Sequence, residues 1–305
     1  MMKKVLVTGA TGFIGRHCLP LLLNKGYEVH AVTSRGSIDG FPDIHWQHCD
    51  LLDSGNVSAL LEKVKPTHLL HLAWFTAPGE YWTSLENLHW VQSSLVLLSA
   101  FVKLGGHRVV IAGTCAEYDW QYGYCSENIT PIRPSTLYGV CKHSLHIMAE
   151  VFLRQVGVSV IWGRLFFLYG PGEHPERLVP SVIRSLLRGE PARCSEGNQI
   201  RDFLYVQDAA RAFIALLEKE ITGTVNIASG TPVALKDIIC KIGGKLNGNH
   251  LIQFGENPSP ANETPLVVAD VRFLKDRLGW SPEFDLDEGL NQTIHWWQEH
   301  LSRKK

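Results

Sequence analysis

The stretch VLVTGATGFIG at residues 5–15 joins a short apolar run to three glycines spaced three residues apart. Its first third is typical of a buried strand, and apolar side chains at helical spacing follow over residues 14–23. Without a β-carbon, Gly9 and Gly12 let the backbone turn sharply and approach a phosphate, while Gly15 lets the helix pack close to the strand. The free N–H groups at the start of that helix can then bind the anion, which predicts a dinucleotide-binding loop. The expected contact residues are Gly9, Thr11, Gly12, Phe13, Ile14 and Gly15.

The first half of the chain alternates short apolar runs with longer stretches of helical periodicity. The expected strands are 5–7, 29–32, 69–73, 109–112 and 158–162, and the expected helices are 14–23, 57–64, 85–102 and 138–155. Strands that alternate with helices form a parallel sheet, because each connection must cross over a face of the sheet. We predict an α/β fold with a Rossmann-type, doubly wound parallel sheet.

The pattern changes after Arg164, where a turn-rich stretch follows at residues 169–175. Further on, helices are expected at 179–188, 208–218, 235–246 and 287–300, and a strand at 224–228. We predict a smaller, mixed α/β substrate-binding lobe in this part. The predicted domains are residues 1–168 and 169–305, and segments such as 201–230 are candidates for a return to the first domain.

Composition excludes several classes of function. With 305 residues, 45% of them hydrophobic and 19% charged, the chain can bury a sizeable core. A net charge of -1 gives no electrostatic footprint for nucleic acid. No window reads as a signal peptide or a membrane span, and the seven cysteines form no C-x-x-C pair. We expect a cytoplasmic protein with reduced cysteines that binds neither nucleic acid nor membrane.

The fourteen histidines include two H-x-x-H pairs, which raises the question of a metal site. His68 and His71 fall in a strand-like run, where alternation puts the two rings on opposite faces. His143 and His146 can share a helix face, but the sequence shows no third ligand nearby. We therefore predict no metal site.

The end of the second predicted strand distinguishes between the two nicotinamide cofactors. An acid there would accept hydrogen bonds from the adenosine ribose and favour NAD, whereas an arginine would bind the additional phosphate of NADP. The strand ends in Thr33-Ser34-Arg35, without an acid. The Ser34 hydroxyl and the Arg35 guanidinium suit a phosphate, so we predict NADP as the cofactor and leave NAD open.

Tyr138 and Lys142 form the one Y-x-x-x-K pattern of the chain. On a helix, side chains four residues apart lie on one face, so the ammonium can sit beside the phenol. A nearby cation stabilises the phenolate and lowers the tyrosine pKa from about 10 toward neutral pH, as proton transfer requires. With eight tyrosines in the chain a chance match would be ordinary, so the spacing alone decides little.

Several motifs together resemble the extended short-chain dehydrogenase/reductases, the NAD-dependent epimerase/dehydratase family that acts on nucleotide sugars. The glycine loop has the family's G-x-x-G-x-x-G spacing, and Thr114 stands four residues before Tyr118 and about two dozen before Tyr138, as in the family. The resemblance implies that Tyr138 is the acid/base, that Lys142 holds the nicotinamide ribose and lowers the pKa of Tyr138, and that Thr114 hydrogen-bonds the reacting oxygen. The further cofactor contacts that it implies are Asp50, Leu51, Leu72 and Ala73.

Segments of the second half extend the resemblance over essentially the whole chain. RLFFLYGPG at 164–172 and RDFLYVQD at 201–208 are similar to family motifs, and Arg201 would suit a diphosphate. Phe167 and Trp90 stand where the family has asparagines, and Asp119-Trp120 replace a glycine. These departures surround the expected sugar site, whose predicted contacts are Thr114, Cys115, Phe167 and Arg201. Four aromatic residues either wall that site or pack a loop against the core: Trp74, Phe75, Tyr81 and Trp82.

The two residues after Thr114 narrow the chemistry. The family's nucleotide-sugar 4,6-dehydratases carry Asp-Glu there, whereas this chain has Cys115-Ala116. An alanine transfers no proton, and Glu117, one position later, would point to the other side of a strand end. We therefore expect a 4-ketoreductase of a nucleotide-diphosphate 4-keto-6-deoxy sugar.

Two alternatives stay open. A 4-epimerase uses the same residues but oxidises and re-reduces one carbon, so it must retain tightly bound cofactor. A non-catalytic dinucleotide-binding regulator needs the glycine loop alone, and the presence of Thr114, Tyr138 and Lys142 speaks against it. The predicted helices at 85–102 and 138–155 resemble the family's four-helix dimer interface, which implies a homodimer.

Overall fold

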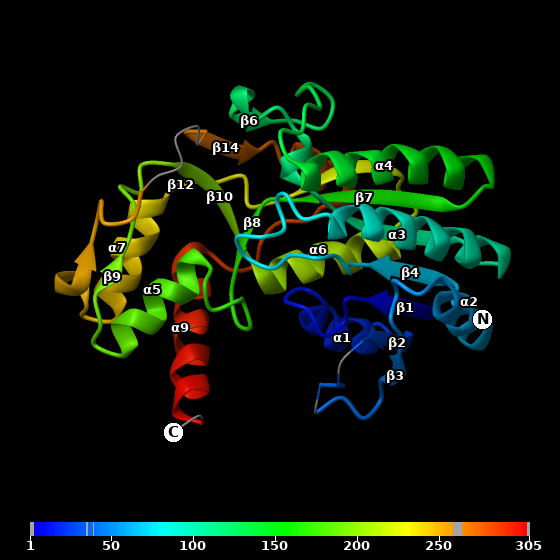
Figure 1. Cartoon of the computed structure of the whole chain (residues 1–305), viewed down its shortest axis with the longest axis horizontal. Helices are drawn as coiled ribbons and strands as arrows, with labels where there is room; N and C mark the ends of the chain where they lie inside the picture. Colours follow the sequence, from blue (N-terminus) through cyan, green and yellow to red (C-terminus); the bar gives the residue numbers. More distant parts are fainter. Residues whose placement is uncertain (1–2, 35, 39, 259–263, 304–305) are drawn as a thin grey trace.

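Seven parallel strands form the large sheet of the protein (Figure 1). The computed structural model describes residues 3–34, 36–38, 40–258 and 264–303. The strand order is β11-β7-β5-β4-β1-β2-β3, and every pairing is parallel. This confirms the predicted α/β, doubly wound fold. The strands are β1 (Lys4–Thr8), β2 (Glu28–Thr33), β3 (His45–His48), β4 (His68–His71), β5 (Arg108–Thr114), β7 (Ser159–Leu165) and β11 (Gly223–Ile227).

The order of the strands reverses beside β1. The chain runs outward from β1 to β2 and β3, and then places β4, β5, β7 and β11 on the other side. In open α/β sheets, ligands bind at the carboxyl ends of the strands where the order reverses. The fold therefore places the expected cofactor site at the carboxyl ends of β1 and β4.

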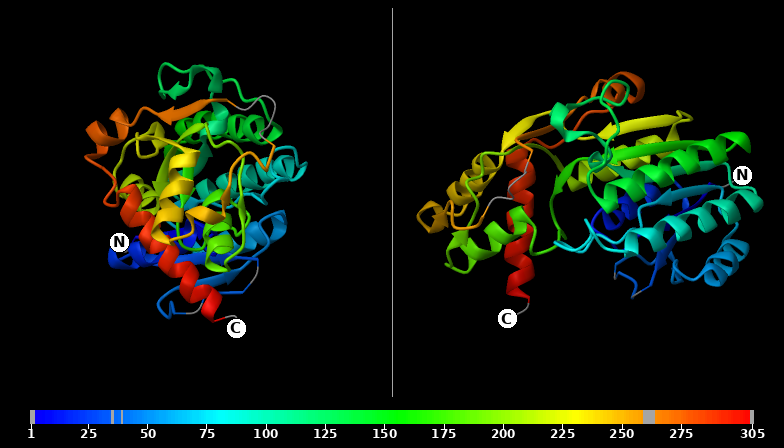
Figure 2. Two further views of the ribbon diagram at one scale, coloured as in Figure 1. Left: turned by 90° about the vertical axis from the view of Figure 1, so that its left-hand side faces the viewer. Right: turned by 45° about the horizontal axis from the view of Figure 1, so that its top comes forward.

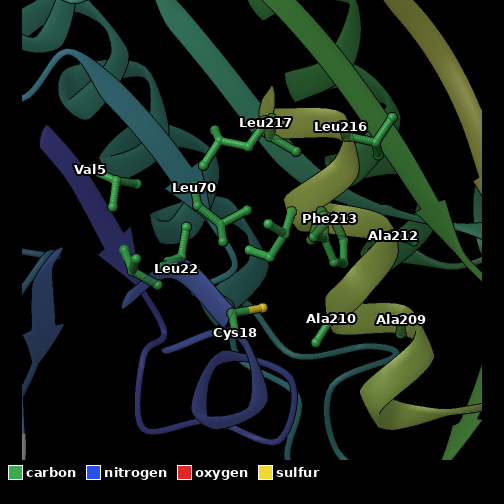
Figure 3. Close-up of a cluster of buried hydrophobic side chains, with 14 of the residues drawn as sticks. Val5, Cys18, Leu22, Leu70, Ala209, Ala210, Ala212, Phe213, Leu216 and Leu217 are labelled. Atoms are coloured by element: carbon green, nitrogen blue, oxygen red, sulfur yellow. The ribbon is translucent and has the colours of Figure 1, made fainter. Parts of the chain in front are cut away.

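Helices cover both faces of this sheet. On one face, Val5 and Leu70 from the sheet pack with Leu22 of α1 and Phe213 and Leu217 of α6 (Figure 3). On the other face, apolar side chains of α2, α3 and α4 form a second buried cluster with the sheet. The helices are α1 (Gly15–Asn24), α2 (Ser54–Val64), α3 (Glu86–Lys103), α4 (Leu137–Gln155) and α6 (Val206–Glu218).

A smaller, mixed part stands at one end of the molecule (Figure 2). Its core is a cluster of buried side chains that includes residues of α5, α7 and α9. These helices are α5 (Leu178–Leu187), α7 (Leu235–Lys245) and α9 (Leu286–Ser302). A five-stranded sheet and a two-stranded sheet complete it. Their strands are β6 (Tyr124–Cys125), β8 (Phe167–Tyr169), β10 (Ile200–Tyr205), β12 (Pro232–Ala234) and β14 (Leu266–Ala269), and β9 (Ala192–Arg193) with β13 (Ile252–Gln253).

The chain passes between the two parts more than once. After β10, helix α6 packs against α1, and β11 forms an edge of the large sheet. Helix α8 (Arg272–Leu278) packs against β11 before α9 returns to the smaller part. The division of the chain at residue 168 stays a prediction. Within the described residues, no helix has the length and apolar character needed to cross a membrane.

Side-chain hydrogen bonds set two element ends that periodicity placed differently. The strand expected over 69–73 ends at His71, because the backbone N–H groups of Leu72 and Ala73 turn toward Thr8 Oγ1, at 3.2 and 3.3 Å. Helix α2 begins at Ser54 rather than at residue 57, because the Asp53 carboxylate caps its first turn. The turn at Leu72 and Ala73 lies against the glycine loop.

Candidate active site

The glycine loop lies against the end of β4. Gly9 has a φ of 66°, and a β-carbon there would come within 2.8 Å of the Ala73 backbone nitrogen. A β-carbon on Gly15 would overlap the Gly9 carbonyl oxygen, so the start of α1 closes onto the loop. The Gly12 N–H donates to the Gly9 carbonyl at 2.9 Å. The loop is therefore a tight backbone cradle at the helix start, which fits the pyrophosphate of a dinucleotide.

The remaining loop residues surround this cradle. Thr11, Phe13 and Ile14 are half-buried, and Ile14 is the residue before the first turn of α1. Arg16 donates to the Thr11 carbonyl at 2.9 Å and to the Gly12 carbonyl at 3.2 Å, which ties the loop to the helix. The structure thus brings the six predicted loop residues together at the end of β1.

The predicted adenosine side is described only in part. Ser34 is exposed directly after β2, and Arg35 lies outside the described residues. Asp50 accepts a hydrogen bond from the Leu52 N–H at 3.0 Å, and Leu51 is buried with its carbonyl bonded by Ser93 Oγ at 2.5 Å. These contacts make the 50–52 segment a fixed turn beside β2.

Thr114, Tyr138 and Lys142 converge at the end of β5. Thr114 is the last residue of β5, and α4 carries the other two on one face. Thr136 caps α4 by accepting from the Gly139 N–H at 3.1 Å. A β-carbon on Gly139 would come within 2.5 Å of the Ala116 carbonyl oxygen, so this glycine lets α4 dock close against the turn that follows Thr114.

Burial acts against the charged forms of both residues on α4. It raises the pKa of Tyr138, and a hydrogen bond with the Thr114 side chain lowers it. Burial also lowers the pKa of the Lys142 ammonium to about 7, while the charge of Glu117 raises it. Lys142 Nζ donates to the Ala112 carbonyl at 2.8 Å and lies 3.8 Å from the centre of the Trp74 ring. The arrangement combines a phenol, a hydroxyl and an ammonium, as general acid catalysis requires.

Aromatic side chains cover Tyr138. The rings of Tyr81 and Trp82 meet the Tyr138 ring edge to face, at centroid distances of 5.0 and 5.7 Å. Trp82 in turn meets Trp120 at 6.3 Å. The 74–82 segment therefore both walls the pocket, through Trp82, and packs against α4.

Trp82 also lines a pocket of about 560 Å³. Phe167 on β8 and Arg201 on β10 line it, with the Arg201 guanidinium 5.4 Å from the centre of the Phe167 ring. Cys115 instead belongs to a buried apolar cluster, and burial raises the pKa of its thiol. The pocket residues are Trp82, Tyr118, Asp119, Trp120, Gln121, Arg133, Pro134, Ser135, Phe167, Arg201 and Thr264.

Several of these pocket residues escaped the sequence analysis. Arg133, Pro134 and Ser135 directly precede the cap of α4, and their closeness to Tyr138 along the chain was a usable signal. Thr264 reaches the pocket from a distant segment that carries no recognisable sequence pattern. Trp90, flagged as a departure near the sugar, packs against Trp74 at 6.2 Å instead.

The structure corrects the expectation that Glu117 lies on a strand end. β5 ends at Thr114, and Glu117 closes a 3-10 turn (η1, Cys115–Glu117) with its side chain fully buried. Its carboxylate accepts from the Thr114 N–H at 2.9 Å, from Trp162 Nε1 at 2.8 Å and from Arg164 Nε at 2.9 Å. The Glu117 carboxylate therefore holds the backbone of Thr114 in place.

The same carboxylate also lies beside the H-x-x-H pair of α4. Ligand atoms of Glu117, His143 and His146 lie within 4.8 Å of one another, so the structure supplies a third candidate ligand that the sequence did not show. The carboxylate already binds three donors, and the Arg164 charge beside it opposes a second cation. No metal site is assigned to this cluster.

The comparisons with known proteins define the class. Residues 5–228 match the NAD dependent epimerase/dehydratase family, and the chain therefore belongs to that family. It is an enzyme of the extended short-chain dehydrogenase/reductase type, as predicted.

Individual relatives carry several activities. The chain is 27% identical to CDP-abequose synthase of Salmonella typhimurium over 96% of this chain and 98% of that one. It is 27% identical to UDP-glucuronate 4-epimerase of Thermodesulfobacterium geofontis, over 98% of each. Among solved structures, MoeE5 in complex with UDP-glucose and NAD is 30% identical, with a TM-score of 0.86 and coverage of 98% of this chain and 99% of that chain.

Proposed function

We propose that this enzyme reduces a ring ketone of a nucleotide-diphosphate-linked deoxy sugar, in particular the 4-keto group of a 4-keto-6-deoxy sugar, with NADP as its cofactor. The observation that carries the proposal is the convergence of Thr114, Tyr138 and Lys142 next to Cys115 and Ala116. The triad supplies one proton donor for a carbonyl oxygen. The two residues after Thr114 supply no acid or base, since Ala116 has none and the Cys115 thiol is buried with a raised pKa.

The proposed mechanism assigns one task to each residue. A dinucleotide held by the glycine loop would supply the hydride. The Tyr138 hydroxyl donates a proton to the ketone oxygen, and the Thr114 hydroxyl hydrogen-bonds that same oxygen. The Lys142 ammonium stabilises the phenolate that Tyr138 leaves behind. Proton transfer of this kind contributes about 10²- to 10⁴-fold to a rate.

The pocket supports a deoxy sugar linked to a diphosphate. Trp82, Trp120 and Phe167 give it apolar walls, against which a hydroxyl would lose its hydrogen bonds to water. A sugar that lacks hydroxyls loses less there. Arg201, only 4% exposed at the pocket wall, suits a diphosphate.

The preference for NADP rests on the end of β2. No carboxylate follows the strand in Thr33-Ser34-Arg35, and Ser34 is exposed. MoeE5 was solved with NAD, so the preference needs its own test. Titration by fluorescence should give tighter binding of NADPH than of NADH, and Ser34→Asp should reverse the order. Tighter binding of NADH by the unchanged protein would refute the preference.

A homodimer through α3 and α4 is part of the proposal. The two helices pack side by side (Figure 1) and carry exposed apolar side chains. These include Leu88 on α3 and Val140, Ile147, Met148 and Val151 on α4. Light scattering at micromolar concentration should give twice the mass of the chain, and Ile147→Glu should give the monomer mass. A monomer mass for the unchanged protein would overturn this assembly.

The test of function mixes the purified enzyme and NADPH with a panel of nucleotide 4-keto-6-deoxy sugars. We expect stoichiometric loss of the nicotinamide absorbance with one of them. Tyr138→Phe should lower the rate by about 10²- to 10⁴-fold, whereas Tyr122→Phe, at an exposed tyrosine, should leave it unchanged. Tightly retained cofactor with a changed sugar but no net consumption would assign a 4-epimerase instead. Cofactor binding without any turnover would favour a regulator.

A further inference from the structure

In the described part of the chain, no carboxylate forms an ion pair with the buried Lys142 ammonium. Lys142 is only 4% exposed. Among the described residues, the Ala112 carbonyl and the face of Trp74 contact Nζ. Electrostatic contacts join it to the Glu117 carboxylate, which also binds Arg164, and to the neutral His71. Tyr138 stands one turn before it on α4. An ammonium that has lost its water in this way needs another source of stabilisation.

We infer that Trp74 is a positioning residue, which holds the Lys142 ammonium at the end of β5 through the face of its indole ring. The distance of 3.8 Å to the ring centre is well inside the range of cation–π attraction, and tryptophan offers the strongest aromatic face. The ammonium donates to the Ala112 carbonyl and lies over the Trp74 ring. The catalytic meaning of this contact rests on the proposed function, whereas the contact itself does not.

A dedicated set of hydrogen bonds fixes the indole ring. Trp74 Nε1 donates to Asn87 Oδ1 at 2.8 Å. The Asn87 side chain is fully buried and donates to the Tyr81 and Ser84 carbonyls at 2.7 and 2.8 Å. Asn87 lies in the first turn of α3, so it ties the ring and the 81–84 segment to that helix. The ring can therefore neither swing away from Lys142 nor turn its edge toward it without breaking its hydrogen bond to Asn87, which is partly buried.

The first experiment measures the ionisation of Lys142 directly. The rate of its acetylation by isotopically labelled acetic anhydride is followed by mass spectrometry from pH 5 to pH 10, in the full-length protein. Removing the aromatic face in Trp74→Leu should lower the midpoint of Lys142 ionisation by about one pH unit. Trp74→Phe should lower it less, because phenylalanine has a weaker face. Trp90→Leu is the matched control, since Trp90 packs on Trp74 but has no contact with the ammonium among those described.

The second experiment uses turnover. In the reductase assay, Trp74→Leu should move the loss of kcat at high pH toward neutral pH, while Trp90→Leu leaves the profile in place. A general packing defect would lower kcat at every pH instead. Equal Lys142 midpoints in Trp74→Leu, Trp74→Phe and the unchanged protein would overturn the inference. If Trp74→Leu lowers the Lys142 midpoint but the unchanged enzyme reduces no ketone, the positioning role of Trp74 is upheld and the proposed function is refuted. If Trp74→Leu does not fold, the Trp74→Phe midpoint alone decides.

Discussion

Replacing Glu117 by glutamine tests how the turn after β5 is stabilised. The carboxylate is fully buried and binds the Arg164 guanidinium, whose residue is only 3% exposed. Glutamine keeps an oxygen for the Thr114 and Trp162 donors, but it turns an NH₂ group toward Arg164 Nε. The substitution thus leaves a buried cation without its partner while changing the volume very little.

The magnitude follows from the burial of the pair. Removing one member of a buried ion pair costs about 3–5 kcal/mol. With an unfolding entropy of roughly 2.1 cal/mol/K per residue, the 305 residues give about 0.64 kcal/mol/K. Glu117→Gln should therefore lower the Tm by about 5–8 °C if the chain unfolds in one transition. Because the charge of Glu117 also raises the pKa of Lys142, its removal leaves less ammonium at neutral pH, and the rate of ketone reduction should fall as well.

The assay is calorimetric unfolding of four proteins. Glu299→Gln, at an exposed salt bridge, is the control and should change the Tm by about 1 °C or less. Replacing both partners, as Glu117→Gln with Arg164→Met, should recover at least half of the loss, since no unpaired charge is then left. A Glu117→Gln protein that unfolds within 1 °C of the unchanged enzyme would show that the ion pair does not stabilise the turn after β5.

Two further predictions concern the cradle and a buried acid. Gly15→Ala places a methyl group against the Gly9 carbonyl, and we expect at least a tenfold loss of NADPH affinity by fluorescence titration. The control is Gly244→Ala, in open space on α7, which should leave the affinity unchanged. Unchanged affinity in Gly15→Ala would contradict the closed loop. Burial raises the pKa of Glu173 from 4.5 to about 8, while Arg177 lowers it. The folded protein then keeps a proton that the unfolded chain loses, so stability from this group is full below pH 4.5 and falls by about 1.4 kcal/mol per pH unit until pH 8. Relative to the unchanged protein, Glu173→Gln should gain in urea midpoint between pH 5 and 8, and a constant difference over that range would refute this titration.

The features that the sequence predicted well are local. The glycine loop, its strand and its helix lie within residues 5–23, so spacing alone reports their geometry. The Tyr138 and Lys142 pair lies on one helix for the same reason. β3 escaped prediction because its sequence HWQH has no apolar alternation and lies at the sheet edge.

The features that the sequence could not predict join distant segments. The pocket wall combines Trp82 from the loop after β4, Trp120 from a 3-10 turn and Phe167 from β8. Glu117 meets Arg164 only because β5 and β7 are neighbours in the sheet. Strand alternation continued from Thr114 therefore predicts the wrong direction for the Glu117 side chain. The 3-10 turn at Cys115–Glu117 directs it into the protein interior instead.

Burial acts on the charges of both Lys142 and Tyr138. Burial raises the pKa of Tyr138 and lowers that of Lys142, so it disfavours both the phenolate and the ammonium. A proton donor needs only a neutral phenol at the start of the reaction, which burial supplies, but the phenolate that it leaves requires a charged lysine beside it. Ala112 and Trp74 contact that lysine, and Asn87 fixes the indole. Burial under these aromatic side chains therefore opposes the charge on Lys142, and the face of the Trp74 ring offsets part of that effect.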